Sequence, residues 1–336
     1  MQVYGIDLSM EKFDVSYINN EGIEMHKQVK NSLNSISKFL SKVPDAAILC
    51  AENTGSYGDL LVFLCNQQNL KIALVPGYNI KHSLGLVKGK TDKVDASRIR
   101  EYAERFNDKL VFKEYDSEEM FELKSLHALR SQLIKARKLL LAGGHSRTKT
   151  PMQSIAVKHH MDMALISLNK QIKEVDFEME TIIRSHEELN DNFVLATSVL
   201  GIGPVIGIDL IIKTGNFKTI DTARKASSYA GVCPFPNKSG KMVGKSKTSP
   251  FADRKLKSLL YMGAKSALKS SKEYKLYYQK KKLEGKAYFL IMNNISNKML
   301  RTVYSVVKSK VPYSRDYICL DPREKNINNS SSKNVA

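Results

Sequence analysis

The chain has 336 residues, of which 42% are hydrophobic and 26% charged, so it can form two or three packed domains and is not disordered throughout. Lys and Arg number 53 against 34 Asp and Glu, which gives a formal net charge of +19. Residues 191–336 carry 27 basic and 9 acidic side chains, whereas residues 1–110 and 111–190 are close to neutral. Such a concentration of positive charge in one segment favours a polyanionic partner, because each phosphate that the segment neutralises releases condensed counterions.

The cysteines and the apolar segments exclude secreted and membrane classes. Four widely spaced cysteines form no Cys-x-x-Cys pair, which argues against a zinc ribbon or a disulfide framework and favours a reduced, cytoplasmic protein. The N-terminus, MQVYGIDLSM, has no signal-peptide pattern. The most apolar long window, 195–212, contains three Gly, a Pro and an Asp, so we expect no membrane span.

Residues 1–110 have the pattern of an α/β domain. Three short strand-like runs with intervening turns predict a meander, and helices then alternate with strands. The predicted strands are Val3–Leu8, Lys12–Ile18, Ile23–Val29, Ala46–Ala51 and Lys71–Val75. The predicted helices are Ser35–Lys42, Tyr57–Asn69 and Asp92–Phe106, the last opened by Thr91. This order is typical of a ribonuclease-H-like, or RuvC-like, sheet.

Residues 111–190 have a helical period. Apolar residues recur at spacings of three and four, first over 126–140 and then over 161–182, with Leu189 continuing the frame. Heptads of this kind, flanked by Glu and Lys, predict a coiled coil or a long helical hairpin. We expect the segment to mediate self-association, although packing within one chain would give the same pattern.

Residues 191–323 predict a basic, mainly helical domain, followed by a disordered tail at 324–336. The run Val199–Pro204 resembles a helix-hairpin-helix loop, in which N–H groups near Gly201 and Gly203 could approach a phosphate. A helix-packing corner is an equally good interpretation. Residues 238–257 predict a Gly/Ser/Lys loop that leads into a basic helix. Its candidate nucleic-acid contacts are Lys238, Lys241, Lys245, Lys247, Arg254, Lys255 and Lys257.

Four carboxylates are candidate metal ligands. Asp7 lies inside the first predicted strand, and alternation points its side chain away from the face of Ile6 and Leu8. Glu52 follows the fourth strand, and Asp92 and Asp95 share a face of one helix. If the four converge they repel one another unless cations hold them, and oxygen ligands suit Mg²⁺ or Mn²⁺. Such ions could polarise a scissile phosphate.

Each acid also has a structural interpretation. Asp7 could close a turn with Ser9, and Glu52 could hydrogen-bond Thr54. Asp92 could cap its helix, with Asp95 solvated in the first turn. The joint pattern favours the metal site over these separate roles.

Six segments carry a resemblance to a known family. GIDLS, AENTGSYG and VKGKTDKVDASRIREYA resemble the Asp-Glu-Asp-Asp, RuvC-like domain of the bridge-RNA-guided transposases of the insertion sequence one-ten family. LGIGPVIGIDLI, ASSYAGVCPFPNKSGKMVGKSKTS and DRKLKSLLYMGA resemble that family's transposase domain. The resemblance covers nearly the whole chain in the same order, and it implies an α/β plus α architecture.

The resemblance also implies a chemistry. Asp7, Glu52, Asp92 and Asp95 would form the metal-binding tetrad, and Ser239 falls where the family has a serine that becomes joined to DNA. The partners implied are donor and target DNA, a structured bridge RNA and further copies of the chain, as dimers and tetramers. The acidic site of one protomer would meet the serine of another. Such a protein would be cytoplasmic and associated with the bacterial nucleoid.

Alternatives to Ser239 chemistry remain open at this stage. The chain has Lys247-Thr248-Ser249-Pro250 where the family often has a glycine, which leaves Ser246 and Ser249 as other candidate nucleophiles. Without the resemblance, Ser239-Gly240 would be interpreted as an ordinary turn. A metal-dependent, junction-resolvase-like endonuclease would use the acids alone. A non-catalytic nucleic-acid-binding protein would use neither centre.

Overall fold

The computed structural model describes residues 2–83, 85, 91–147, 154–239 and 242–314. The chain divides into two compact units, Met1–Ser117 and Glu118–Ala336. The helical segment 111–190 and the basic segment 191–323, expected as separate domains, thus fall largely within one compact unit. The expected tail at 324–336 lies outside the described residues.

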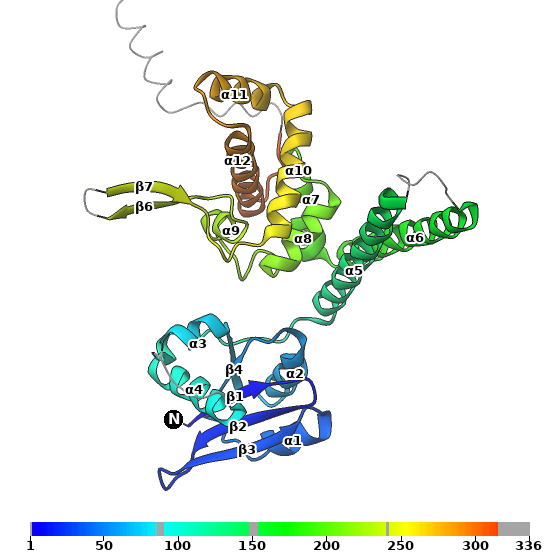
Figure 1. Ribbon diagram of the computed structural model, residues 1–336. Coiled ribbons are helices and arrows are strands. Elements are labelled where there is room, and N and C mark those ends of the chain that lie inside the picture. Colours follow the sequence, from blue (N-terminus) through cyan, green and yellow to red (C-terminus); the bar gives the residue numbers. More distant parts are fainter. Residues whose placement is uncertain (1, 84, 86–90, 148–153, 240–241, 315–336) are drawn as a thin grey trace, which may run out of the picture. The chain divides into compact units, whose positions relative to one another are not determined.

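A five-stranded sheet of order β3-β2-β1-β4-β5 forms the centre of the N-terminal unit (Figure 1). Its strands are β1 (Val3–Leu8), β2 (Lys12–Ile18), β3 (Glu24–Lys30), β4 (Ile48–Glu52) and β5 (Lys71–Val75). The first three pair antiparallel, which confirms the predicted meander, and β4 lies parallel to both β1 and β5. Four of the five residues of β4 are fully buried, as expected for a strand covered on both faces.

Helices cover both faces of this sheet. They are α1 (Leu33–Leu40), α2 (Asp59–Gln67), α3 (Gly77–Ser83) and α4 (Asp92–Arg105), with 3₁₀ turns at Gly55–Gly58 and Asn107–Lys109. Tyr4, Ile6 and Leu8 of β1 join the core under α1 and α2, whereas Val3 packs with Ile99 of α4 on the opposite face. Helix α3 was not predicted, because its sequence, GYNIKHS, has too few apolar residues to give a helical period.

Gly5 allows α4 to lie directly on β1. A Cβ atom at this position would be 2.2 Å from the carbonyl oxygen of Ala96 and 2.3 Å from the backbone nitrogen of Arg100. Both are backbone atoms, so a larger side chain could be accommodated only by moving the helix. The glycine therefore fixes how closely α4 approaches the sheet.

Arg100 holds α4 in the same place by polar contacts. Its side chain is buried, and Nη1 donates to Glu104 Oε1 at 2.7 Å. Nη2 lies 3.2 Å from Glu24 Oε1 on β3, and Nε donates to Ser16 Oγ on β2 at 3.2 Å. Two carboxylates and a hydroxyl compensate the buried guanidinium, as a buried charge requires.

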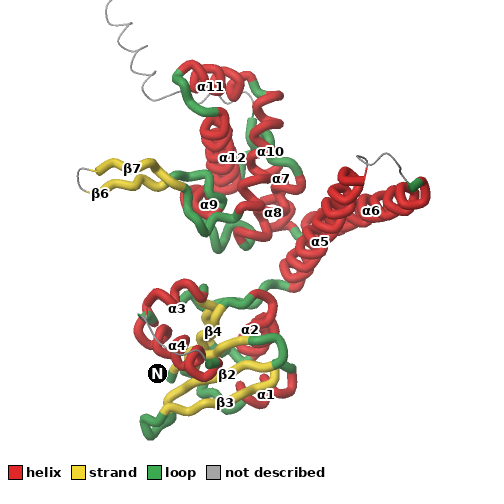
Figure 2. Tube along the Cα trace, viewed as in Figure 1, coloured by secondary structure: helices red, strands yellow, loops and turns green. Residues whose placement is uncertain are grey.

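In its described residues, the C-terminal unit is helical apart from one hairpin (Figure 2). Its helices are α5 (Glu118–Arg147), α6 (Ile155–Ser185), α7 (Glu187–Ser198), α8 (Pro204–Thr214), α9 (Ala223–Tyr229), α10 (Arg254–Ser270), α11 (Lys272–Leu283) and α12 (Tyr288–Ser309). The hairpin consists of β6 (Phe235–Ser239) and β7 (Met242–Lys247). One core joins α7–α12, and a second joins the first turns of α5 and the last turns of α6 to α7 and α8.

The predicted helical hairpin of the middle segment is confirmed as α5 packed along α6. Ile172, Val175 and Met179, which are in the predicted frame, are buried, and Leu189 is buried in the following helix α7. Met163 and Ile166 lie outside that frame and are 55% and 63% exposed. The hairpin thus has a buried seam, and its outer side carries exposed apolar residues among charged ones. No helix of the described residues is long and apolar enough to cross a membrane.

The prediction of a loop over 238–257 was wrong for its first part. Residues 235–239 and 242–247 pair as antiparallel strands, with Ser239 opposite Met242. The segment has no alternation of apolar and polar residues, so its strand pairing left no periodic signal in the sequence. The basic helix that follows is confirmed as α10, which begins at Arg254 with Asp253 as its N-cap.

Candidate functional site

Asp7 occupies the face of β1 that is covered by α4. It lies two residues beyond Gly5 on the same face, and its side chain is half-buried. This confirms the orientation predicted from the alternation with Ile6 and Leu8. The Ser9 turn is closed by Lys12, whose carbonyl accepts from both the amide and the hydroxyl of Ser9, so Asp7 does not make that turn.

Asp14 is a fifth carboxylate, outside the four predicted from the sequence. The pairing of β1 with β2 sets Asp14 directly opposite Asp7. Asp14 is 8% exposed, and both of its carboxylate oxygens lie 3.3 Å from Nε2 of Gln28 on β3. Directly paired residues share a face of the sheet, so Asp14 extends the acidic group beyond the predicted four.

Glu52 closes the group at the carboxyl end of β4, where it pairs with Val75 of β5. Its carboxylate lies against Gly77, the first residue of α3, since a Cβ atom there would be 2.1 Å from Glu52 Oε1. The Thr54 hydroxyl is buried and has no hydrogen-bond partner among the described residues, so Glu52 does not make the alternative contact with Thr54. The glycine leaves the space that the Glu52 side chain occupies.

Asp92 and Asp95 lie in the first turn of α4. The N-cap is Thr91, as predicted, and its hydroxyl accepts from the Val94 amide at 3.3 Å. Asp92 therefore does not cap the helix with its side chain and is exposed, while Asp95 is half-buried. Both positions are electrostatically suited to negative charge near the positive end of the helix.

Four of the acids act electrostatically on the fifth, Asp7. Burial, followed by the negative charges of Asp95 and Asp92, raises the pKa of Asp7 to about 6. Glu52 and Asp14 contribute smaller increments to the same rise. Among the described residues, however, no three His, Cys, Asp or Glu side chains lie close enough to hold a metal ion. The structure thus brings the predicted acids near one another without forming a closed coordination shell.

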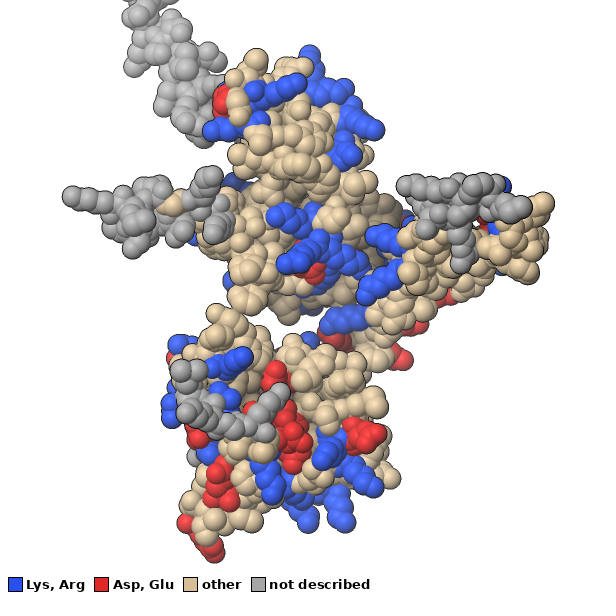
Figure 3. Space-filling model, in the orientation of Figure 1, with Lys and Arg blue, Asp and Glu red and all other residues tan. Residues whose placement is uncertain are grey.

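This electrostatic arrangement fits a divalent cation. A half-buried carboxylate with four like-charged neighbours has uncompensated negative charge, which a cation would relieve. All the candidate donors are carboxylate oxygens, the class that Mg²⁺ and Mn²⁺ prefer. Acidic side chains also lie across the visible face of this unit, shown in red in Figure 3.

The candidate nucleophile Ser239 is the last residue of β6, next to residues 240–241, which are outside the described part of the chain. Lys241 is therefore also outside it. For Lys238, Ser239, Lys245, Ser246 and Lys247 the backbone is in the hairpin strands, and nothing is described of the side chains. Ser249 follows the hairpin, and its hydroxyl accepts from the Phe251 amide at 3.2 Å.

Gly201 and Gly203 lie between α7 and α8, in the loop predicted there. Gly201 has a φ of +89°, and a Cβ atom would be 2.6 Å from the carbonyl oxygen of Gly263 on α10. Gly203 is the N-cap residue of α8 and has no atom within 4 Å of a built Cβ position. Packing and backbone conformation are sufficient to explain Gly201, and a role of either residue in phosphate binding stays a prediction.

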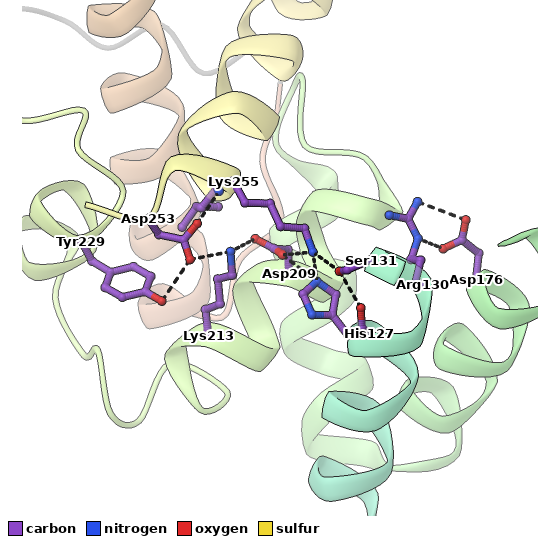
Figure 4. Close-up of polar contacts among 10 residues, drawn as sticks. His127, Arg130, Ser131, Asp176, Asp209, Lys213, Tyr229, Asp253 and Lys255 are labelled. Atoms are coloured by element: carbon purple, nitrogen blue, oxygen red, sulfur yellow. Dashed lines mark hydrogen bonds and ion pairs between the residues drawn. The ribbon is translucent and has the colours of Figure 1, made fainter. Parts of the chain in front are cut away.

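The three basic candidates at the start of α10 have different environments. Arg254 is exposed, Lys257 is half-buried, and Lys255 turns into a polar cluster between helices (Figure 4). Lys255 Nζ lies 2.7 Å from Ser131 Oγ and 2.9 Å from His127 Nε2, both on α5. Burial lowers the pKa of the Lys255 ammonium despite the nearby carboxylate of Asp209.

Asp209 is at the centre of that cluster, and the sequence analysis missed it. Its side chain is 1% exposed and lies 2.8 Å from His127 Nε2 and 3.0 Å from Lys213 Nζ. Lys213 also reaches Asp253 Oδ2 at 2.8 Å, which links α8 to the N-cap of α10 (Figure 4). An acid in the apolar helix PVIGIDLIIKT could have indicated such a partner, because a buried charge must be compensated.

Asp253 connects this cluster to α9. Burial alone would raise the pKa of Asp253, but its hydrogen bonds to Lys213 and to the Leu256 amide outweigh burial and hold the pKa below its usual value. The Tyr229 hydroxyl donates to Asp253 Oδ2 at 3.2 Å, and burial followed by the Asp253 charge raises the pKa of Tyr229 to about 12. The cluster thus joins α5, α8, α9 and α10.

An acidic group suited to a divalent cation and a strongly basic helical unit together define a protein that acts on the phosphodiester backbone of nucleic acid. Two transposase family models match this chain. The model of the DEDD transposase of IS110, described as a transposase, matches residues 4–142, and the model of the IS116/IS110/IS902 transposase family matches residues 194–279. The chain belongs to the IS110/IS116/IS902 family of transposases, which are enzymes that cut and rejoin DNA.

Individual relatives support this assignment. The chain is 26% identical to a pilin gene-inverting protein of Moraxella lacunata over 324 residues, which are 93% of this chain and 97% of that protein. It is 27% identical to a pilin gene-inverting protein of Moraxella bovis over 80% of this chain and 82% of that protein. An uncharacterized 44.8 kDa protein of insertion element IS116 from Streptomyces clavuligerus is 26% identical over 52% of this chain and 43% of that protein.

Proposed function

We propose that this transposase is a site-specific DNA recombinase with two chemical centres, a metal-dependent acidic centre and a serine nucleophile. The observation that carries the proposal is the group of five carboxylates formed by Asp7 and its four acidic neighbours, which lies within the segment that the IS110 transposase model matches. The sheet order and the helices on both faces support a RuvC-like form for the N-terminal unit. The two relatives named as gene-inverting proteins support recombination in preference to simple cleavage.

Asp7, Glu52, Asp92 and Asp95 would form the acidic centre and hold the metal ion, with Asp14 beside them. Mg²⁺ or Mn²⁺ bound there would supply positive charge to a phosphate in the transition state. Without such an ion, the five acids would repel the DNA backbone. Gly5 leaves room for α4 to lie on the sheet, and Gly77 leaves room for the Glu52 side chain, so both glycines help to position the acids.

The serine centre would be Ser239 at the end of the β6–β7 hairpin. Its hydroxyl oxygen would attack a DNA phosphorus, and one bridging oxygen of the DNA would leave with a proton. The resulting phosphodiester between serine and DNA would conserve the energy of the broken linkage for rejoining. A serine hydroxyl needs activation near neutral pH, and the surrounding lysines can stabilise the phosphate charge. We infer that the acidic centre of another protomer supplies the activation, with donor and target DNA selected by a bridge RNA.

The decisive experiment is mass spectrometry for a DNA adduct after incubation of the full chain with its RNA, Mg²⁺ and donor DNA. The expected result is an adduct on Ser239 that disappears in Ser239→Ala and persists in Ser246→Ala and Ser249→Ala. An adduct on either of those serines would move the nucleophile. Cleavage that survives in Ser239→Ala but is lost in Asp7→Asn would identify a metal-dependent endonuclease instead.

A second measurement addresses the RNA. Protein purified without added nucleic acid should carry a discrete structured RNA, and removing that RNA should abolish sequence-specific strand exchange. Strand exchange at the same sites by RNA-free protein would contradict RNA guidance and leave the two chemical centres unaffected.

A further inference from the structure

A cavity of about 420 Å³ opens at the base of the β6–β7 hairpin. Its wall is formed by Pro234 just before β6, Thr248 just after β7, and side chains of α10 and α12. This volume lies within the range of pockets that hold small ligands, roughly 300–1,000 Å³. The cavity therefore borders the strands that carry the proposed nucleophile.

Aromatic rings form one side of this cavity. Tyr261 of α10 and Phe289 of α12 are nearly parallel, with ring centroids 6.0 Å apart and planes inclined by 25°. Phe289 is 73% exposed, although it is a large apolar ring. Tyr288 of α12 lies edge-on to Phe289, with ring centroids 5.6 Å apart and planes inclined by 72°. An exposed aromatic surface of this kind is suited to stacking against another flat ring.

The polar groups around the rings are cationic or neutral. Lys257 lines the cavity, and Lys265 Nζ lies 6.0 Å from the Tyr261 ring centroid. Neither lysine forms an ion pair with a described residue, and none of the residues that line the cavity is acidic. Asn293 donates through Nδ2 to the Val232 carbonyl at 2.9 Å, while its Oδ1 accepts no hydrogen bond from the described residues.

We propose that this cavity binds an unpaired nucleobase of the DNA strand engaged by the hairpin. Stacking on Phe289 and Tyr261 would hold the base, Asn293 could read its edge, and Lys257 and Lys265 would face the adjoining phosphates. Positive charge without acids distinguishes this occupant from an apolar side chain of a protein partner, which would gain nothing from the lysines. The choice of DNA rests on the proposed function, because strand exchange requires bases to leave their duplex.

The test uses the full chain with Ser239→Ala, so that the DNA stays uncut, and strands that carry 2-aminopurine at successive positions. Stacking on an aromatic ring should quench the fluorescence at one position. Phe289→Ala should remove this quenching and weaken binding roughly 5- to 150-fold, whereas Phe289→Trp should retain both. Phe251→Ala is the matched control, because Phe251 is 69% exposed and does not line the cavity.

Three outcomes would overturn the proposal. The first is equal binding and quenching by Phe289→Ala and Phe251→Ala. The second is quenching of a labelled RNA strand but not of DNA, and the third is a Phe289→Ala variant that changes only in oligomeric state. Since Phe289 is exposed, its replacement should leave the thermal unfolding midpoint nearly unchanged, which checks that the variant folds. Quenching in the Ser239→Ala protein combined with no Ser239 adduct in the wild-type protein would refute the serine chemistry and keep the base site. A wild-type adduct combined with no quenching would do the reverse.

Discussion

Asp7 experiences four carboxylates from other parts of the N-terminal unit, on β2, β4 and α4. Folding therefore brings together like charges that the unfolded chain keeps apart. In the metal-free protein this repulsion lowers the free energy of unfolding. A bound cation attracts all the carboxylates, so the acidic group then raises the free energy of unfolding. The same side chain is thus a source of instability or of stability, depending on the ion.

Asp7→Asn should therefore raise the unfolding midpoint of the metal-free protein by a few degrees, because it removes repulsion at the centre of the acidic group. Mg²⁺ should raise the midpoint of the wild-type protein and have little effect on the variant. Differential scanning calorimetry with EDTA or Mg²⁺ measures both changes, independently of activity. Asp45→Asn, an exposed acid of the same unit, should retain the full Mg²⁺ response. An equal response in Asp7→Asn would contradict the metal site.

Asp14 could have been predicted with one further step. In an antiparallel pair the residue numbers of partners have a constant sum, and the predicted strands 3–8 and 12–18 with their short turn set Asp7 near Asp14. The four predicted acids could be identified without knowing how the strands pair, since each was placed by its own strand or helix. A fifth acid follows only once the strands are paired.

At the scale of elements, the hydrophobic pattern predicted the sheet well because most of its strands are apolar and short. The bounds of β1, β2 and β5 agree with the prediction, and β3 and β4 differ by one or two residues at their ends. The β6–β7 hairpin was missed because lysines and glycines give no period. The segment that contains the hairpin is closed by a tertiary hydrogen bond, from the Asp253 amide to the Tyr229 carbonyl at 2.8 Å, which leaves no pattern in the sequence.

The His127–Asp209–Lys213 cluster likewise has no sequence motif, since its members come from α5 and α8. Asp209→Ala should destabilise the C-terminal unit by about 3 kcal/mol, the lower end of the range for breaking a buried ion pair. The variant removes the buried carboxylate that His127 and Lys213 share, and Lys213 keeps Asp253 as its remaining partner. Urea unfolding followed by circular dichroism measures the change. Asp221→Ala removes an exposed pair with Lys225 and should have little effect. Similar losses in the two variants would show that the cluster is not a structural junction.

At the scale of the whole molecule, two features bear on association. The net charge of +19 favours binding of DNA, and the exposed apolar residues of α6 favour contact with other copies of the chain. We propose that Met163 and Ile166 take part in the contact between protomers. Both are more than half exposed, on a helix whose inner seam is already filled by α5. Surfaces of this kind commonly mark interfaces between proteins.

The double substitution Met163→Glu, Ile166→Glu should shift the protein to monomers in sedimentation velocity and abolish strand exchange. Binding of one duplex should persist, because the basic helices are unchanged. Ser167→Glu adds charge to an exposed polar position of the same helix and should leave assembly intact. An unaltered sedimentation profile of the double variant would place the contact between protomers elsewhere.

Gly5 and Gly77 bear on how insertion elements decay. Copies of such elements accumulate mutations, and an inspection of acidic residues alone would score many of them as intact. A side chain at Gly5 would push α4 away from the sheet, and one at Gly77 would displace the carboxylate of Glu52, so we expect either change to impair a copy whose acids are all preserved. Glycine at both positions is therefore a criterion for sorting functional copies from relics within a genome.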